Sequence, residues 1–300
     1  MLEPYDVLVA GSYSIDLIFT GLPQFPELGK DVVGTGFEMA PGEAYNSTVA
    51  LHRLGVKVGW AGDFGNDVFS RLALENARRE GLDESLFVHH DRPLRRISAA
   101  ASYPDERAFI TYYDPDPPAP AVLRALETVS PRIFYLPGLY YNWQIEPGIL
   151  KARGMQIVMD GNSKGATLKD PGVRRSVEGA DILMPNAAEA KGLTGAANVQ
   201  EALCQLAEIC RLVVVKDGPG GAYAWQEGEI LHAAGLALDP IDTTGAGDCF
   251  NAGFLRAWLE GLPLKDCLQW GNIVGGLSTL KRGGTGQVTT TRDVEEWLER

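Results

Sequence analysis

Short apolar runs separated by helical patterns constrain the fold of this 300-residue chain more than any other feature. Six runs predict core strands, over residues 7–10, 56–61, 133–136, 156–159, 182–184 and 212–215. Between most of them, apolar residues recur with the spacing of an amphipathic helix. This alternation is typical of an α/β fold, with a mostly parallel central sheet flanked by helices. With 45% hydrophobic residues, the chain can fill the core of one domain spanning residues 1–300.

Small or polar residues follow most of the predicted strands. Examples are Gly11-Ser12, Asp160-Gly161-Asn162, Pro185-Asn186 and Lys216-Asp217-Gly218. Because ligands of open α/β sheets bind outside the carboxyl ends of the strands, these residues predict a shared crevice at one edge.

Two stretches depart from the alternation of strand and helix. Residues 16–20 and 30–38 frame a turn rich in Pro and Gly, and residues 96–103 and 107–113 flank a second turn at 104–106. Both read as hairpins, which predicts a small antiparallel sheet inserted at about 16–38 and 96–113. An ordinary edge hairpin is the alternative to a sheet that covers a site.

The run from Asp242 to Asp248, Asp-Thr-Thr-Gly-Ala-Gly-Asp, predicts a small-residue turn at the start of a helix. Asp248 heads an apolar stripe formed by Ala252, Leu255 and Leu259, so it is expected to point inward. The N–H groups of Gly245, Ala246 and Gly247 lie where a helix leaves donors unpaired. An anion pocket beside an inward carboxylate suits phosphoryl transfer to a hydroxyl. The alternative is an Asp N-cap on a Gly-rich turn.

This run resembles the C-terminal motif of the ribokinase-like (PfkB) family of carbohydrate and nucleoside kinases, Asp-Thr-x-Gly-Ala-Gly-Asp. The resemblance implies that Asp248 is the catalytic base and that Gly245, Ala246 and Gly247 form the anion hole. It also implies a ribokinase-like fold, ATP and Mg²⁺ as cosubstrate and cofactor, and a small β sheet that closes as a lid over the sugar. A lid would exclude water and limit wasteful hydrolysis of ATP.

Two segments are candidates for binding the acceptor. Residues 41–46 lead into a predicted helix over 47–54, whose inner face includes Asn46, and a buried amide needs hydrogen-bond partners such as sugar hydroxyls. Asp16 follows the first strand, and a carboxylate accepts hydroxyl bonds well. The resemblance implies that Asp16, Gly42 and Asn46 bind substrate. The chain departs from the family's paired glycines here, with Glu43 after Gly42, which puts the hinge and the close approach of substrate in doubt.

The nucleotide site is assigned mainly through the resemblance. Asn186 and Glu189 match an Asn-x-x-Glu element whose Glu orders Mg²⁺, partly through water, and one nearby carboxylate is enough for that ion. The pair would also make a good helix capping box. Lys216, Gly218 and Gly221 lie in a Gly-rich turn that borders the nucleotide in the family, although such a turn alone also suits a hairpin. Asn272, in a predicted helix over 268–280, lies where relatives have a residue near the adenine.

A monovalent cation is the last ligand implied by the resemblance. In many relatives the motif's first Asp, the second Thr and a later Gly-rich loop enclose such an ion, and hard oxygen ligands suit K⁺. Carried over to this chain, the ligands are Asp242, Thr244, Ser278 and Gly283.

Net charge and the N-terminus limit the partners. The formal charge is −12 and no long basic run occurs, which argues against a nucleic-acid or anionic-membrane partner. The N-terminus lacks the features of a signal peptide, no apolar run approaches the ~20 residues of a membrane helix, and the four cysteines form no CxxC pair. We therefore expect a cytoplasmic enzyme, and relatives suggest a homodimer formed through the lids.

Two other functions stay open. A nucleoside kinase is one, because aromatic faces can stack a purine and many aromatic side chains lie near the predicted lid or strand ends. They are Tyr13, Tyr103, Tyr112, Tyr113, Tyr140, Tyr141 and Trp143. The other is a catalytically silent protein that binds a sugar or nucleotide, for which the departure at Glu43 is the best argument.

Overall fold

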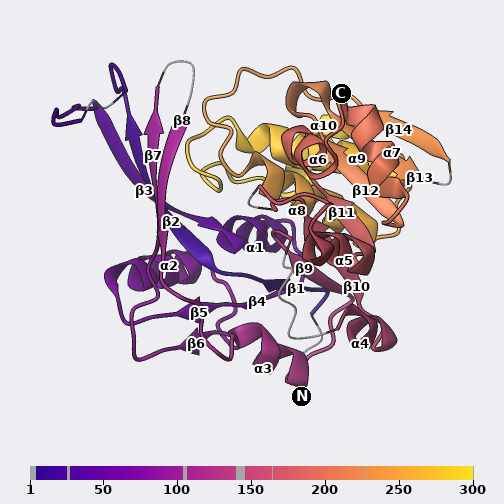
Figure 1. Ribbon diagram of the computed structural model, residues 1–300, viewed down its shortest axis with the longest axis horizontal. Helices are drawn as coiled ribbons and strands as arrows, with labels where there is room; N and C mark the ends of the chain where they lie inside the picture. Colours follow the sequence, from indigo (N-terminus) through magenta and orange to yellow (C-terminus); the bar gives the residue numbers. More distant parts are fainter. Residues whose placement is uncertain are drawn as a thin grey trace.

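An eight-stranded sheet forms the centre of the computed structural model, which describes residues 5–25, 28–103, 107–139, 146–163, 165–226 and 228–299 (Figure 1). Its order is β14-β13-β12-β11-β10-β9-β1-β4, and the strands from β12 to β4 are parallel. Their bounds are β1 Val7–Ala10, β4 Val58–Ala61, β9 Ile133–Leu136, β10 Gln156–Asp160, β11 Ile182–Met184, β12 Leu212–Lys216, β13 Ala222–Gln226 and β14 Glu229–Ala233. The predicted α/β architecture is confirmed, and the edge strands β13 and β14 are antiparallel additions.

Helices cover both faces of this sheet because its central strands are apolar on both sides. In β1, Val7 and Val9 join one core cluster, whereas Leu8 and Ala10 join the other. The first cluster packs under α1 Ala44–Arg53, α2 Val68–Arg79, α8 Ala246–Leu259, α9 Leu264–Ser278 and α10 Thr291–Leu298. The second packs under α3 Ala121–Thr128, α4 Pro147–Ala152, α5 Pro171–Gly179, α6 Ala187–Thr194 and α7 Val199–Ala207. Strands that are buried on both faces are typical of parallel sheets.

A second sheet projects from the main body and is seen on the left of Figure 1. Its order is β3-β2-β7-β8, with β2 Tyr13–Thr20, β3 Gly36–Glu43, β7 Arg96–Ser102 and β8 Arg107–Tyr113. We call it the lid. The pairs β2–β3 and β7–β8 are antiparallel, as the hairpins predicted, while the two hairpins join through a parallel β2–β7 pairing.

Two element boundaries differ from the prediction in this region. The strand expected over 30–38 runs instead over Gly36–Glu43, and the helix expected from residue 47 begins at Ala44. Gly42 and Glu43 are therefore the end of a lid strand that turns directly into α1. The cause is the backbone of Glu43, which has a φ of 55° and reverses the chain without a loop. Similarly, α9 spans Leu264–Ser278 where 268–280 was expected.

Strand register decides which lid side chains face the site. Residues directly opposite one another share a face, and Asp16 lies opposite Ser98. On the other face, Phe19 lies opposite Phe37 and packs its ring 5.1 Å from it. One face of the lid thus carries the polar side chains of Asp16 and Ser98, and the other carries this aromatic pair. A shift of one residue in the strand register would move the side chains of each face to the other face.

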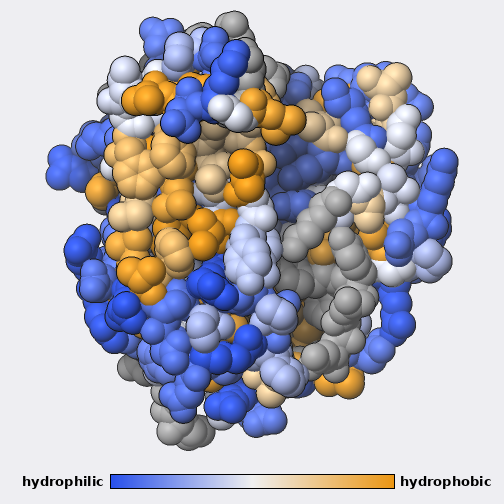
Figure 2. Space-filling view, turned by 60° about the vertical axis from the view of Figure 1, so that its left-hand side comes forward, coloured by the Kyte–Doolittle hydropathy of each residue, from blue (hydrophilic) through white to orange (hydrophobic). Residues whose placement is uncertain are grey.

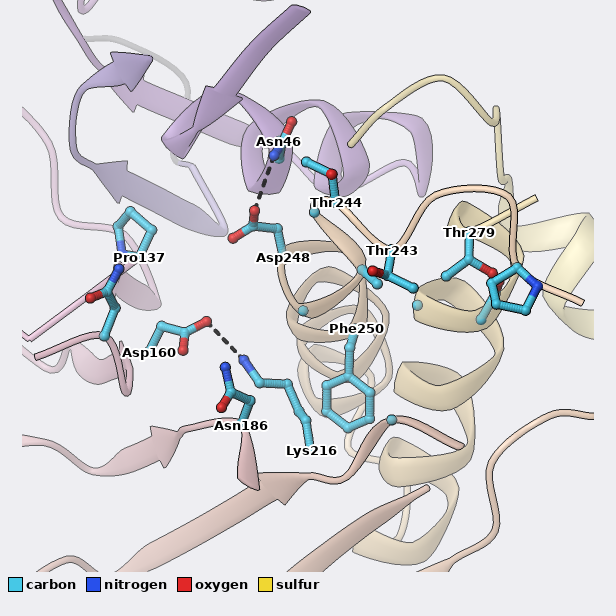
Figure 3. Close-up of a pocket in the computed structure, with 18 of the residues that line it drawn as sticks. Asn46, Pro137, Asp160, Asn186, Lys216, Thr243, Thr244, Asp248, Phe250 and Thr279 are labelled. Carbon is cyan, nitrogen blue, oxygen red and sulfur yellow. Dashed lines mark hydrogen bonds and ion pairs between the residues drawn. The ribbon is translucent and has the colours of Figure 1, made fainter. Parts of the chain in front are cut away.

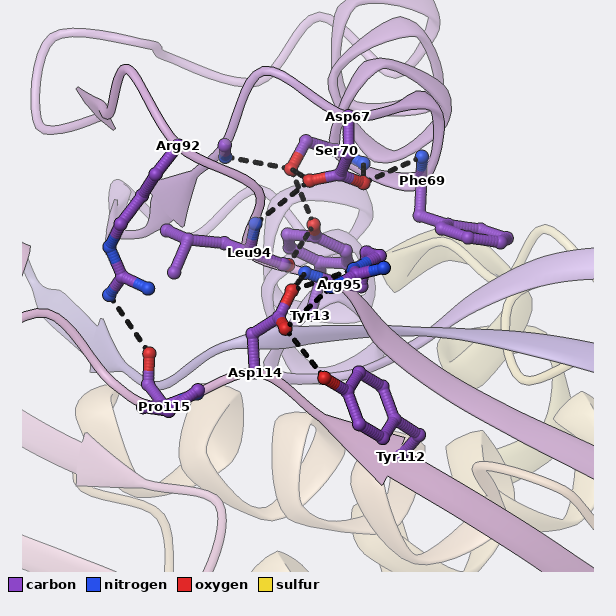
Figure 4. A network of polar contacts seen from close by, with 11 residues as sticks. Tyr13, Asp67, Phe69, Ser70, Arg92, Leu94, Arg95, Tyr112, Asp114 and Pro115 are labelled. Atoms are coloured by element: carbon purple, nitrogen blue, oxygen red, sulfur yellow. Dashed lines mark hydrogen bonds and ion pairs between the residues drawn. The ribbon is translucent and has the colours of Figure 1, made fainter.

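Buried and part-buried hydrogen bonds fix the base of the lid to the main body (Figure 4). The Tyr13 hydroxyl contacts Ser70 Oγ at 2.6 Å and donates to the Leu94 carbonyl at 2.8 Å. Asp67 accepts from the N–H of Leu94 at 2.9 Å, and Asp114 accepts from the Arg95 side chain and backbone. These contacts hold both ends of the β7–β8 hairpin.

In the part of the chain that the structure describes, none of the helices combines the length and the apolar character needed to cross a membrane.

Candidate active site

A pocket of about 580 Å³ lies between the lid, the carboxyl ends of the parallel strands and the start of α8 (Figure 3). It is lined at one end by lid residues and at the other by the loops after β12 and β14 and by α9. Most of the predicted site residues line it, namely Asp16, Asn46, Asn186, Glu189, Lys216, Gly218, Gly221, Thr244, Gly245, Ala246, Gly247, Asp248 and Asn272. The predicted crevice at the carboxyl edge of the sheet is therefore present.

Asp248 lies in the first turn of α8 and points into this pocket. Its Oδ2 accepts a hydrogen bond from Asn46 Nδ2 at 3.1 Å, and its Oδ1 accepts one from Ser47 Oγ at 3.2 Å. Burial, and then the charge of Asp160, raise the pKa of Asp248 to about 7, although the bonds from Asn46 and Ser47 oppose this shift. A carboxyl group that titrates near neutrality is suited to accept a proton.

The turn before α8 requires its glycine. Gly245 caps the helix with a φ of 71°, and a Cβ there would lie 2.6 Å from the backbone of Gly284 and 2.9 Å from Asn46. Of the three predicted amide donors, the Ala246 N–H already donates to the Thr243 carbonyl at 3.3 Å. Gly247 lies one residue further, among the donors that a helix leaves unpaired. The N-terminus of α8 therefore remains a suitable site for an anion.

The lid end of the pocket has one acceptor atom without a hydrogen-bond partner among the described residues. Asn46 is buried, and its Oδ1 has no hydrogen-bond partner among the described residues. Such an atom needs a donor, and a ligand hydroxyl would supply one. Asp16 lines the same end of the pocket, and its carboxylate accepts a hydrogen bond from Ser14 Oγ at 3.2 Å. Burial raises the pKa of Asp16 to about 6. Gly42 is not among the residues that line the pocket, but a Cβ there would lie 2.9 Å from Asp16 Oδ2, so its substrate-binding role stays a prediction.

A buried ion pair that the sequence did not reveal lies beneath the anion site. Lys216 Nζ donates to Asp160 Oδ2 at 2.8 Å and to Asn251 Oδ1 at 3.2 Å, and both ionic residues are less than 10% exposed. Asn251 also donates to Asp160 and to the hydroxyl of Tyr135. In the sequence, Asp160 stands at the end of a strand and Asn251 follows Asp248 by three residues. These positions do not show that Asp160 pairs with Lys216, 56 residues away, or with Asn251, 91 residues away.

Asn186 and Glu189 form the capping box that was the structural alternative for this pair. The Asn186 side chain accepts from the Glu189 N–H at 2.9 Å, and Glu189 Oε2 accepts from the Asn186 N–H at 2.8 Å. Both also line the pocket, so capping and ligand binding are compatible. Burial, and then the nearby Asp160 carboxylate, raise the pKa of Glu189.

The far end of the pocket is lined by the loops after β12 and β14 and by α9. Gly221 has a φ of 89°, and a Cβ there would lie 2.1 Å from the Ala233 carbonyl. Asn272 donates to the carbonyls of Ala233 and Ala234 at 2.9 and 3.1 Å, so it holds the exit of β14 as well as lining the pocket. With Gly218, these residues shape a slot that Leu236 and Leu238 also line.

Three of the four residues predicted to hold a monovalent cation lie together. Asp242 Oδ1 accepts from the N–H and the hydroxyl of Thr244 at 2.9 and 2.8 Å, and its Oδ2 accepts from the Gly283 N–H at 2.9 Å. Ser278 instead donates its hydroxyl to the Gly275 carbonyl of its own helix. The described residues contain no cluster of three or more His, Cys, Asp or Glu side chains able to hold a metal.

Among the aromatic residues that suggested a nucleoside acceptor, one of the four that the structure describes lines the pocket. Tyr113 lines it, whereas Tyr13 is buried at the base of the lid and Tyr112 bonds to Asp114. Tyr140, Tyr141 and Trp143 lie outside the described residues, and Tyr103 does not contribute to the pocket wall as described.

The site places a buried carboxyl group beside a helix N-terminus, under a lid and at the carboxyl edge of an α/β sheet. This arrangement is suited to phosphoryl transfer onto an alcohol group. A profile of the pfkB family carbohydrate kinases matches residues 5–119 and 149–291. The chain therefore belongs to this family.

Curated relatives match the chain over nearly all of its length. A ribokinase of Bacillus subtilis is 27% identical over 305 residues, covering 98% of this chain and 99% of the relative. A 2-dehydro-3-deoxygluconokinase of the same organism is 27% identical and covers 90% of each chain. Both names denote carbohydrate kinases, and this chain is a carbohydrate kinase by family.

Solved structures show the same fold. A ribokinase from Thermotoga maritima superposes with a TM-score of 0.83 at 21% identity, covering 99% of this chain and 100% of the other. A putative ribokinase II from E. coli, solved in complex with ATP and Mg²⁺, gives a TM-score of 0.78 at 23% identity and covers 98% and 99%. The predicted ribokinase-like fold is thereby confirmed.

Proposed function

We propose that this carbohydrate kinase transfers the γ-phosphoryl group of ATP to a hydroxyl of a small carbohydrate, with Asp248 as the general base. The observation that carries the proposal is the position of the Asp248 carboxylate, which lies in the pocket between an acceptor end with the unpaired Oδ1 of Asn46 and the N-terminus of α8. Burial, which raises the pKa of Asp248 to about 7, supports this role. Asp248 would orient the acceptor hydroxyl and take its proton as attack proceeds.

Other residues would bind the two substrates. Asn46 Oδ1 and the Asp16 carboxylate would accept hydrogen bonds from acceptor hydroxyls. Donors in the first turn of α8 and the Lys216 ammonium beneath Gly247 would stabilise charge on the transferring phosphoryl group. The slot lined by Gly218, Gly221 and Asn272 would hold the nucleotide.

The residues present fit a magnesium ion. Asp160 and Glu189 lie close enough to raise the pKa of Glu189, and a divalent cation would relieve this repulsion between like charges. Magnesium keeps several waters and uses few protein carboxylates, so these two with the phosphates suffice. When bound, the ion would neutralise the ATP phosphates. A K⁺ ion at Asp242, Thr244 and Gly283 stays a prediction, and so does a cytoplasmic location.

An ADP-coupled screen over sugars, sugar acids, sugar phosphates and nucleosides tests the proposed function. We expect ATP-dependent ADP formation with at least one of the sugars or sugar derivatives. A nucleoside acceptor would support the alternative suggested by the aromatic residues. Thermal stabilisation by a sugar without ADP formation would contradict a kinase and favour a silent binding protein.

The pH dependence of the rate should report the Asp248 carboxyl. Because kcat/KM follows the ionisation of the free enzyme, we expect it to fall about tenfold per pH unit below pH 7, as Asp248 takes up a proton. Below pH 6 the fall should steepen, since the pKa of Asp16 is raised to about 6. A rate measured from pH 5 to pH 9 that stays flat down to pH 5 would exclude Asp248 as the base.

We also propose that the enzyme forms a homodimer through its lids. The face of the lid turned away from the pocket exposes Phe37, Met39, Ile110 and Tyr112, and Figure 2 shows apolar side chains gathered on that side of the molecule. A contiguous apolar surface of this kind marks an interaction site more often than a free surface.

Sedimentation velocity tests the homodimer. Ile110→Glu places a charge on this apolar face at a side chain that is 80% exposed, so it should convert dimers to monomers without unfolding the chain. Ile149→Glu, on the exposed surface of α4, is the matched control and should remain dimeric. A monomeric wild-type enzyme at micromolar concentration would contradict the homodimer.

A further inference from the structure

Glu43 holds a backbone conformation that favours glycine. Its φ is 55° and its ψ is −131°, and it is the one non-glycine residue with a positive φ among the described residues. A side chain in such a conformation is strained, and strain of this kind clusters at ligand sites because the surrounding structure holds it in place. A glycine would adopt this backbone conformation with less strain, yet position 43 holds a glutamate.

The Glu43 side chain lines the acceptor end of the pocket and is held there by the lid. The Tyr113 hydroxyl donates to its Oε1 at 2.6 Å. That is the one hydrogen bond to this carboxylate within the described part of the chain, so Oε2 remains available to a ligand. The nearby cation, Arg96, lies over the Tyr113 ring with its guanidinium carbon 5.4 Å from the centroid and pairs with Asp116. It is not part of the pocket wall.

The acceptor end of the pocket is therefore strongly acidic. Asp16, Glu43 and Asp248 line it, and Lys216 is the one cationic side chain among the described residues that line the whole pocket. Lys216 belongs to the nucleotide side and is bound to Asp160. The charge of Glu43 helps to raise the pKa of Asp16, after the larger effect of burial, so Glu43 and Asp16 interact. An anionic acceptor would meet the carboxylates of Asp16 and Glu43, and that of Asp248 when it is ionised, with no cationic side chain among the described residues at this end of the pocket.

We propose that Glu43 is a specificity-determining residue that restricts the acceptor to uncharged polyols and rejects sugar acids and sugar phosphates. This inference rests on the proposed function of the same pocket. Glu43 accepts a hydrogen bond from an acceptor hydroxyl and repels a carboxylate or phosphate at the same place. Rejection by an unpaired charge is a common source of specificity.

Matched pairs of acceptors test this inference. D-ribose is compared with D-ribonate and with D-ribose 5-phosphate, and D-fructose with 2-dehydro-3-deoxygluconate, using kcat/KM and the Kd from calorimetry. Wild type should favour the neutral member of each pair by about 100-fold or more, and Glu43→Gln should reduce this ratio at least about tenfold. The amide keeps the acceptor for Tyr113 but removes the charge. Glu38→Gln, an exposed carboxylate on the same strand and outside the pocket, should leave the ratio unchanged.

Glu43→Gly separates selectivity from folding. Glycine relieves the strained φ, so the melting temperature should be no lower than that of wild type, while the selectivity ratio should fall as in Glu43→Gln. An unchanged ratio in both variants, or a wild type that prefers the anionic member, would overturn the inference. If no acceptor yields ADP, the proposed function is contradicted, and the ratio of Kd values still decides the role of Glu43.

Discussion

Asp248→Asn is expected to lower kcat about a thousandfold while the protein folds normally and binds ATP with unchanged affinity. A positioned general base contributes on the order of 10²–10⁴ in rate, and asparagine cannot accept the proton of the acceptor hydroxyl. The amide is isosteric and can still pair with Asn46 and Ser47, so the geometry of the first turn of α8 is preserved. Steady-state kinetics and calorimetry of ATP binding measure the two effects separately.

The same variant should also change stability, in a direction set by the pKa of Asp248. The folded-state pKa is about 7 against an ordinary value of 3.8, so between these pH values the folded protein holds a proton that the unfolded chain has released. The free energy of unfolding of wild type therefore falls as the pH rises from about 4 to about 7. Asp248→Asn lacks this loss and should be at least as stable as wild type at pH 8. For the kinetic prediction, a kcat of Asp248→Asn within tenfold of the wild-type value would exclude Asp248 as the general base.

Asp160→Ala is expected to destabilise the enzyme by about 3–5 kcal/mol, because it leaves the Lys216 ammonium buried without its carboxylate. Asp160 also accepts hydrogen bonds from Asn251 Nδ2 at 2.6 Å and from the Gly161 N–H at 2.6 Å. Removing the carboxylate therefore leaves these buried donors without their acceptor as well. Urea unfolding at pH 7 measures the change in the free energy of unfolding.

Two further variants distinguish the buried charge from a simple loss of packing. In Asp160→Leu combined with Lys216→Met, both charges are removed, and most of the lost stability should return. Glu178→Ala breaks the exposed pair with Arg174 on α5 and should cost less than about 1 kcal/mol. A cost below about 1 kcal/mol for Asp160→Ala would mean that Lys216 finds another partner or releases its proton.

The positions of most site residues followed from local sequence. The local sequence of the run Asp242 to Asp248 explains its conformation, because Gly245 permits the left-handed turn that places Asp248 in the first turn of α8. Short apolar runs located the six parallel strands, and their polar ends located the pocket. These features depend on residues a few positions apart, and periodicity reports such neighbours directly.

Other features depended on contacts between distant segments. Periodicity placed β3 too early and α1 too late, because the turn between them is set by the strained backbone of Glu43 and by the pairing of β3 with β2. The parallel β2–β7 pairing, which brings Ser98 and Tyr113 to the pocket with Asp16, joins hairpins about 80 residues apart. Only register decides which lid face meets the acceptor.

The fold class, the small-residue turn before α8 and the inward carboxylate of Asp248 follow from residues close together along the chain. How these groups are charged and paired depends on tertiary contacts. Asp248 titrates near neutrality because folding encloses it close to Asp160, and Lys216 is held by that same carboxylate. Burial and proximity of charges are properties of three-dimensional packing, so spacing along the chain cannot report them.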